Sequence, residues 1–212
     1  LVDKKTLPTA LIAKSQRGES VSKPIERKSS TNYDLSFVEV TEVKEGGVGD
    51  RVCVDLTTML DSGEGMLVGS SSGSMVLVHG ETVESEFVPT RPFRVNAGSL
   101  HSYIMMADGS TSYLSELKMG DRVLVISSDS SSRPAVVGRV KIESRPFILF
   151  KWKDEKHNES GALLQQAETV RLISDSGLIS ITGLKPGMKL LGWSGGSGRH
   201  VGQEISAKVK EK

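Results

Sequence analysis

Apolar and polar residues alternate along most of this chain in short runs that end at Gly, Ser, Asp or Pro. The run "LSFVEVTEV" alternates, and "RVLVIS", "FILFKW" and "LISITGL" are rich in β-branched residues. Alternation with a period of two is typical of strands that bury one face. The pattern therefore predicts an all-β fold, a short-stranded domain resembling a β-barrel or a β-sandwich.

Gly and Ser mark the turns between these runs. The segment 63–75, "GEGMLVGSSSGSM", allows two interpretations. Closely spaced glycines can cradle a phosphate, but a P-loop ends in Lys-Ser/Thr and leads into a helix, and neither feature follows here. A glycine-rich hairpin is the favoured interpretation. A second hairpin is predicted to turn at Asp175–Gly177, and a further turn at Asp108-Gly109.

A turn motif recurs along the chain. "GDRVCVD" begins at Gly49, "GDRVLVI" begins at Gly120, and "GLKPGMKLLGW" repeats the form near the end. Each predicts a glycine with positive φ followed by an aliphatic strand. The recurrence indicates two related halves, about 35–125 and 126–212.

The first 34 residues differ from the rest. Apart from "LPTALIA" they are polar and basic, which is typical of a linker that becomes ordered only against another surface. We therefore expect an extended N-terminal arm at 1–34, docked on a protein partner, and a β-rich domain at 35–212.

Charge and composition exclude several classes. Lys and Arg number 27 and Asp and Glu 26, so no global charge draws the chain to nucleic acid, and we expect no nucleic-acid partner. No apolar run is long enough to predict a transmembrane segment. The single cysteine, Cys53, lies between valines and is expected to be a buried strand residue.

Candidate chemistry gathers in "VHGETVESEFVPTRPFRVNAGSLHSY". His79 and Glu81 share a strand face, but two ligands do not make a metal site, and we expect no metal. Arg91 and Arg94 can bind a carboxylate, Asn96 can both donate and accept, and His101 can carry a proton near neutral pH. Together with Glu81 and Tyr103 these residues form either a substrate-binding surface or a structural network, and the residues alone leave the two even.

The motifs "GDRVCVDL", "VLVHGETVES", "RPFRVNAGSLHSY" and "AVVGRVKIESRPFILF", in this order, resemble the archaeal-type, second class of 3-dehydroquinate synthase, which also has relatives in plants and algae. The resemblance covers about 37–212 and implies a β-rich C-terminal domain. For complete members it implies NAD-dependent oxidative deamination and cyclisation of 2-amino-3,7-dideoxy-D-threo-hept-6-ulosonate to 3-dehydroquinate. It also implies substrate binding by Arg91, Arg94 and Asn96, with His101 as the catalytic residue.

Two functions follow from the resemblance. Most of the family's N-terminal region has no counterpart here, which favours a non-catalytic domain kept as a scaffold subunit of a larger assembly, photosynthetic and in a plastid. On this interpretation the chain binds no cofactor. The alternative is a working 3-dehydroquinate synthase of the shikimate pathway, which uses NAD.

Overall fold

A computed structural model describes residues 33–84, 88–195, 199–200 and 203–204 of the chain. Nearly all of the predicted arm, and with it the predicted docking of that arm on a partner, lies outside the described residues. The only helices among the described residues are two 3₁₀ turns of three residues each, η1 (Leu114–Glu116) and η2 (Ile181–Gly183). No helix among them is long and apolar enough to cross a membrane. The prediction of an all-β fold is confirmed.

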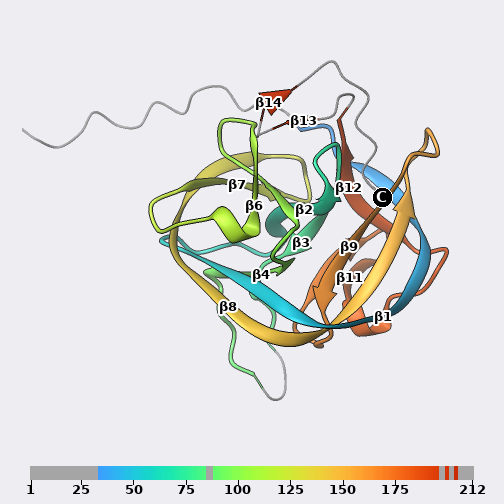
Figure 1. The fold of residues 1–212 in the computed structure, drawn as a ribbon, viewed down its shortest axis with the longest axis horizontal. Coiled ribbons are helices and arrows are strands. Elements are labelled where there is room, and N and C mark those ends of the chain that lie inside the picture. Colours follow the sequence, from blue (N-terminus) through green and yellow to red (C-terminus); the bar gives the residue numbers. More distant parts are fainter. Residues whose placement is uncertain (1–32, 85–87, 196–198, 201–202, 205–212) are drawn as a thin grey trace, which may run out of the picture. The chain divides into compact units, whose positions relative to one another are not determined.

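The described strands are antiparallel, and twelve of them form one sheet (Figure 1). Their bounds are β1 (Ser36–Leu56), β2 (Glu64–Ser71), β3 (Ser74–His79), β4 (Arg94–Ser99), β5 (Tyr103–Met105), β6 (Thr111–Tyr113), β7 (Arg122–Ser127), β8 (Ser132–Lys153), β9 (Glu159–Gln165), β10 (Arg171–Ser174), β11 (Gly177–Ser180), β12 (Lys189–Ser194), β13 (Arg199–His200) and β14 (Gln203–Glu204).

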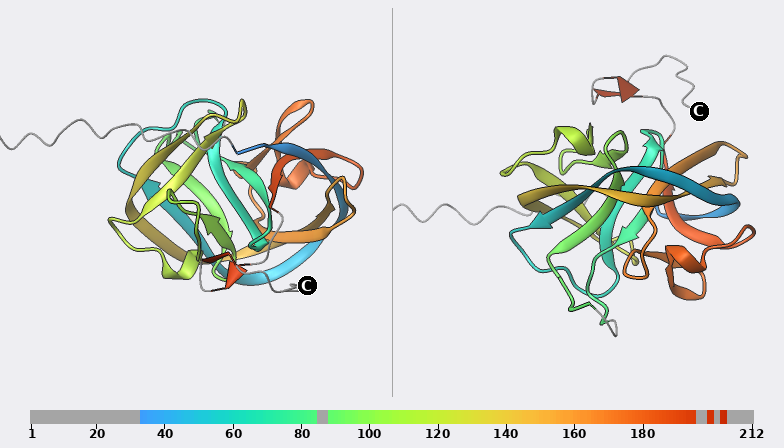
Figure 2. Two further views of the ribbon diagram at one scale, coloured as in Figure 1. Left: turned by 90° about the horizontal axis from the view of Figure 1, so that it is seen from above. Right: turned by 60° about the horizontal axis from the view of Figure 1, so that its bottom comes forward.

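Two long strands organise the sheet. β1 and β8 pair with each other over most of their length and curve together through the molecule (Figure 2). At one end this ribbon is flanked by β4 and β7, and at the other end by β12 and β9. The ladder shifts register between Glu45 and Val48, where Gly47 has φ of 74°. This irregularity lets one strand pass through a stretch whose glycines suggest a turn.

The Gly-rich segment 63–75 is the hairpin that the local pattern favours, because it forms β2, a tight turn and the start of β3. The predicted hairpin at Asp175–Gly177 is confirmed as well, since it joins β10 to β11. Both segments are therefore hairpins that connect neighbouring strands of the sheet.

The recurring turn motif is present twice. Gly120 and Gly187 have φ of 97° and 87°, each follows a 3₁₀ turn, and each leads into a strand, β7 or β12. Gly49 differs from the prediction, because it lies within β1 and its φ is not positive. One copy falls in each predicted half, and the division into halves stays a prediction.

The core is aliphatic, with two aromatic rings at its centre. Phe150 and Trp152 on β8 are fully buried with ring centroids 5.4 Å apart. The indole N–H of Trp152 donates to the hydroxyl of Ser74 at 3.0 Å, which satisfies its one polar atom. This packing fixes β8 against β3 and holds the ribbon in place.

Candidate functional site

One face of the sheet formed by β4, β1 and β8 is polar although it is largely buried. Arg51, Cys53 and Asp55 alternate along β1, and in the ladders Cys53 lies opposite Asn96 while Asp55 lies opposite Arg94. Directly opposed residues of antiparallel strands point to the same face. We call these five buried residues the arginine face.

Asp55 connects three strands. Its two carboxylate oxygens accept hydrogen bonds from Nε and Nη2 of Arg94, at 2.6 and 2.9 Å, and Oδ2 also accepts one from Nε of Arg139 at 2.7 Å. Burial acts to raise the pKa of Asp55, but the hydrogen bonds from the two arginines outweigh it and keep the pKa below its ordinary value. The guanidinium of Arg94, predicted to bind a substrate carboxylate, is engaged by this internal carboxylate.

Glu81 and Arg91 lie beside this face. They form an antiparallel bridge, and the backbone N–H of Glu81 donates to the carbonyl of Arg94 at 2.8 Å. Nη1 of Arg91 lies 3.5 Å from the Glu81 carboxylate, and this is its one side-chain contact among the described residues. Burial raises the pKa of Glu81, and the neighbouring arginines only partly oppose the shift. Glu81 is therefore a weakly paired, buried carboxyl.

Two buried polar atoms of the arginine face have no hydrogen-bond partner within the described part of the chain. Nδ2 of Asn96 donates to Gln165 on β9 at 2.8 Å, but its Oδ1 accepts nothing. Arg51 donates to the sulfur of Cys53 and, at 2.5 Å, to Glu143, but its Nε donates to nothing. Both atoms are closed to solvent, so leaving them unpaired is costly to the fold.

Burial also decides the role open to Cys53. The residue is fully buried, and this raises the pKa of its thiol despite the nearby arginines. A protonated, inaccessible thiol is a poor nucleophile. The expectation that Cys53 is a buried strand residue is confirmed.

His101 lies in the turn that follows β4, beside Ser99, which lies opposite Arg51 in the ladder of β1 and β4. Its Nδ1 is 3.1 Å from the hydroxyl of Ser99, and its Nε2 is 3.4 Å from the hydroxyl of Ser70. The Ser99 hydroxyl is in turn 3.1 Å from that of Ser102. We call these four residues the hydroxyl chain.

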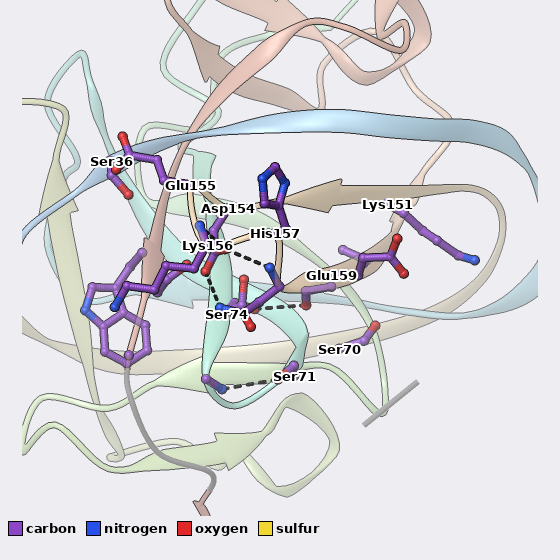
Figure 3. A pocket seen from close by; sticks show the side chains of 18 of the residues that line it. Ser36, Ser70, Ser71, Ser74, Lys151, Asp154, Glu155, Lys156, His157 and Glu159 are labelled. Carbon is purple, nitrogen blue, oxygen red and sulfur yellow. Dashed lines mark hydrogen bonds between the residues drawn. The ribbon is translucent and has the colours of Figure 1, made fainter. Parts of the chain in front are cut away.

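The hydroxyl chain ends at a large open hollow of about 1360 Å³. His101 and Ser70 line it, together with residues of the turn after β8. Figure 3 shows Ser70 and the labelled residues of that turn. Asp154 in that turn accepts backbone hydrogen bonds from Lys156 and Asn158, at 2.9 and 2.8 Å, which fix the shape of the rim. A second hollow of about 230 Å³ also borders His101 and Ser99. His101 is thus the predicted site residue with the most open space around it.

Two other predicted residues have separate partners. The hydroxyl of Tyr103 lies 2.8 Å from that of Tyr113, and their rings are stacked at 4.5 Å on the β5–β6 hairpin. His79 is buried, and its Nε2 accepts from the backbone N–H of Gly63 at 3.0 Å. Within the described ranges, no group of three or more His, Cys, Asp or Glu side chains is arranged to hold a metal ion.

The structure thus brings Arg94, Asn96, Glu81 and Arg91 together and places His101 and Tyr103 apart from them. Sequence reasoning missed Arg51 and Asp55. Their signal was present in "DRVCVDL", where charged residues at alternate positions mark a buried polar face between apolar neighbours. The substrate and proton-transfer roles assigned to the predicted residues stay predictions.

Comparison with known proteins decides the family. A family model described as the 3-dehydroquinate synthase II C-terminal domain matches residues 37–212. The chain belongs to this family.

Curated proteins that are similar to this chain are named 3-dehydroquinate synthase. The 3-dehydroquinate synthase of Methanosphaera stadtmanae is 47% identical over 189 residues, which cover 89% of this chain and 52% of the relative. That of Methanocaldococcus jannaschii is 46% identical over 195 residues, which cover 92% of this chain and 54% of the relative. The chain spans about half the length of the curated relatives it matches. No solved structure matches it.

These relatives correct the expected function. The sequence predicts a non-catalytic scaffold on the ground that most of the family's N-terminal region has no counterpart in it. However, relatives with about 46% identity over about 90% of the chain are named as the enzyme. The scaffold interpretation is therefore wrong, and these relatives favour the enzymatic alternative.

Proposed function

We propose that this chain acts as part of a 3-dehydroquinate synthase. The reaction is the oxidative deamination and cyclisation of 2-amino-3,7-dideoxy-D-threo-hept-6-ulosonate to 3-dehydroquinate, with NAD as the oxidant, in aromatic amino-acid biosynthesis. The observation that carries the proposal is the identity of about 46%, over about 90% of the chain, to proteins named as this enzyme. The chain's own contribution is Arg91, a partly exposed arginine beside the buried arginine face.

Arg91 is the best candidate for the substrate carboxylate. Its side chain is about one-third exposed and makes a single long contact, so its other donors are available to an anionic group. Arg94 joins β4 to β1 instead, because both of its side-chain hydrogen bonds go to Asp55. The binding of a substrate hydroxyl by Asn96 stays a prediction, because its unpaired Oδ1 is closed to solvent. Glu81 orients Arg91.

The described residues do not fit a nucleotide site of the common kind. A dinucleotide's pyrophosphate is usually held by a glycine-rich turn at the start of a helix. Here the Gly-rich segment 63–75 turns between two strands, and the helical elements among the described residues are only three residues long. We therefore assign NAD to none of these residues.

A segment exchange tests the proposal. Residues 37–212 of this chain replace the matching segment of the Methanocaldococcus jannaschii relative, and NADH absorbance is followed with the aminoheptulosonate and NAD. We expect turnover at the order of magnitude of the unexchanged relative. A folded exchange protein without turnover, beside an active relative, contradicts the proposal.

The same exchange protein tests the substrate contact. Arg91→Ala removes donors for a carboxylate, so KM should rise roughly tenfold to a hundredfold. Arg145→Ala is the matched control, because Arg145 is an exposed arginine that pairs with Glu143 on β8. A KM that rises equally in both variants indicates a general charge effect and contradicts a specific role for Arg91.

The compartment is a separate matter. A plastid location was expected together with the scaffold, and it stays a prediction. The partners of the chain and the absence of nucleic acid among them also stay predictions.

A further inference from the structure

The hydrogen bonds of the hydroxyl chain determine which ring nitrogen of His101 carries the proton in the neutral ring. Ser102 is completely buried, and Ser99 is nearly buried although it borders the smaller hollow. Ser102 Oγ has one side-chain neighbour among the described residues, the hydroxyl of Ser99. Each hydroxyl has a single hydrogen to donate. The direction of the chain can therefore be worked out by placing these hydrogens.

Only one arrangement uses every buried hydrogen. Ser102 donates to Ser99, and Ser99 donates to Nδ1 of His101. If Nδ1 instead carried the proton and donated to Ser99, then either Ser99 or Ser102 would keep a hydrogen with no acceptor among the described side chains. Leaving one buried donor unsatisfied disfavours that arrangement roughly tenfold or more.

We propose that Ser99 is a positioning residue that fixes neutral His101 as the tautomer with a bare Nδ1 and a protonated Nε2. The Nε2–H group then points toward Ser70 at the edge of the large hollow. It offers a hydrogen bond to an oxygen acceptor, such as the carbonyl or carboxylate oxygen of a bound ligand. Neutral His101 acts as a proton donor through Nε2, and the lone pair of Nδ1 accepts the hydrogen bond from Ser99.

The tautomer does not depend on the proposed function, whereas the use of the Nε2 proton in a reaction does. A tautomer measurement and the turnover assay can therefore fail separately. The measurement is a long-range ¹H–¹⁵N spectrum of the ¹⁵N-labelled chain, recorded at about pH 9 so that the neutral imidazole form is observed. His101→Gln identifies the His101 signals, because they disappear in that variant.

We expect a protonated Nε2 and a bare, hydrogen-bonded Nδ1 in the unaltered chain. Ser99→Ala should move the Nδ1 resonance toward that of a ring with no donor, and Ser99→Thr, which keeps the hydroxyl, should restore it. Ser112→Ala removes an exposed hydroxyl on β6 and should leave the spectrum unchanged.

Two results overturn the proposal. One is a neutral ring with its proton on Nδ1 in the unaltered chain, a result that does not depend on the Ser99 variants. The other is an Nδ1 resonance that is the same in Ser99→Ala and in the unaltered chain, with the variant shown to be folded by its melting temperature.

Discussion

The arginine face and the hydroxyl chain lie close together in the sequence but solve opposite problems. The arginine face buries ionised groups, and Asp55 holds two arginines from different strands. The hydroxyl chain uses neutral groups and opens on a hollow. Buried charges must be paired to be tolerated, and pairing uses up their donors. The comparison teaches that a motif rich in arginine can hold a sheet together while the neutral residues beside it remain free to meet a ligand.

The largest effect that separates the two regions is expected at Asp55. Asp55→Ala leaves Arg94 buried without its carboxylate, so the free energy of unfolding should fall by about 3–5 kcal/mol. Urea unfolding measures the change. Arg139→Ala is the control, because this arginine is mostly exposed and its removal should cost less than about 1 kcal/mol. Equal losses in the two variants would show that the pair at Arg94 is not special.

The arginine face should also respond to pH with two opposite signs. The pKa of Asp55 is lowered, so its contribution is present above its ordinary value of 3.8 and is lost as the pH falls through the folded-state pKa. The pKa of Glu81 is raised, so its contribution is present below its ordinary value of 4.5 and is lost as the pH rises through the folded-state pKa.

Unfolding measured from pH 3 to pH 7 tests these signs. Asp55→Asn should reduce the loss of stability in acid, whereas Glu81→Gln should make the protein more stable at the neutral end of the range. If Glu81→Gln is instead destabilising at every pH, its carboxylate is a necessary partner of Arg91, and the description of Glu81 as weakly paired is wrong.

The smallest effect on stability is expected at the mouth of the hollow. Ser70→Ala removes only a long contact of 3.4 Å to His101, so the free energy of unfolding should change by less than about 0.5 kcal/mol. Thermal unfolding measures this change. A loss above about 1 kcal/mol would place Ser70 among the residues that hold the fold, and the contrast between the two regions would weaken.

Local features of the fold could be read from the sequence because they depend on near neighbours. Alternation predicts the strands, and the hairpins at 63–75 and at Asp175–Gly177 follow from turn residues. The continuity of β1 could not be read, because Gly46 and Gly47 look like a turn, and only pairing with β8 shows that they form an irregularity within one strand.

The residue types of the candidate site could be predicted from the sequence, but the hydrogen-bond partners of these residues could not. Arg94 and Asn96 stand out as residue types, and their clustering is real. Asp55, the partner of Arg94, lies 39 positions from it in the sequence. Arg139, the second arginine that binds Asp55, lies 84 positions from Asp55. Such pairings are set by strand register, which a single sequence does not display. For the same reason, the hydroxyl partners of His101 were not foreseen.

The β1–β8 ribbon has a consequence for how the protein is made. Arg51 and Glu143 are paired across it although they are 92 positions apart. During synthesis β1 leaves the ribosome long before β8, its main partner, has been made. Until then, the backbone hydrogen-bonding groups and the apolar side chains of β1 are exposed to solvent. Contacts this distant slow folding, and waiting strands are prone to aggregate. We therefore expect the yield of soluble protein to depend on translation speed and on chaperones more strongly than the stability of the finished fold would suggest.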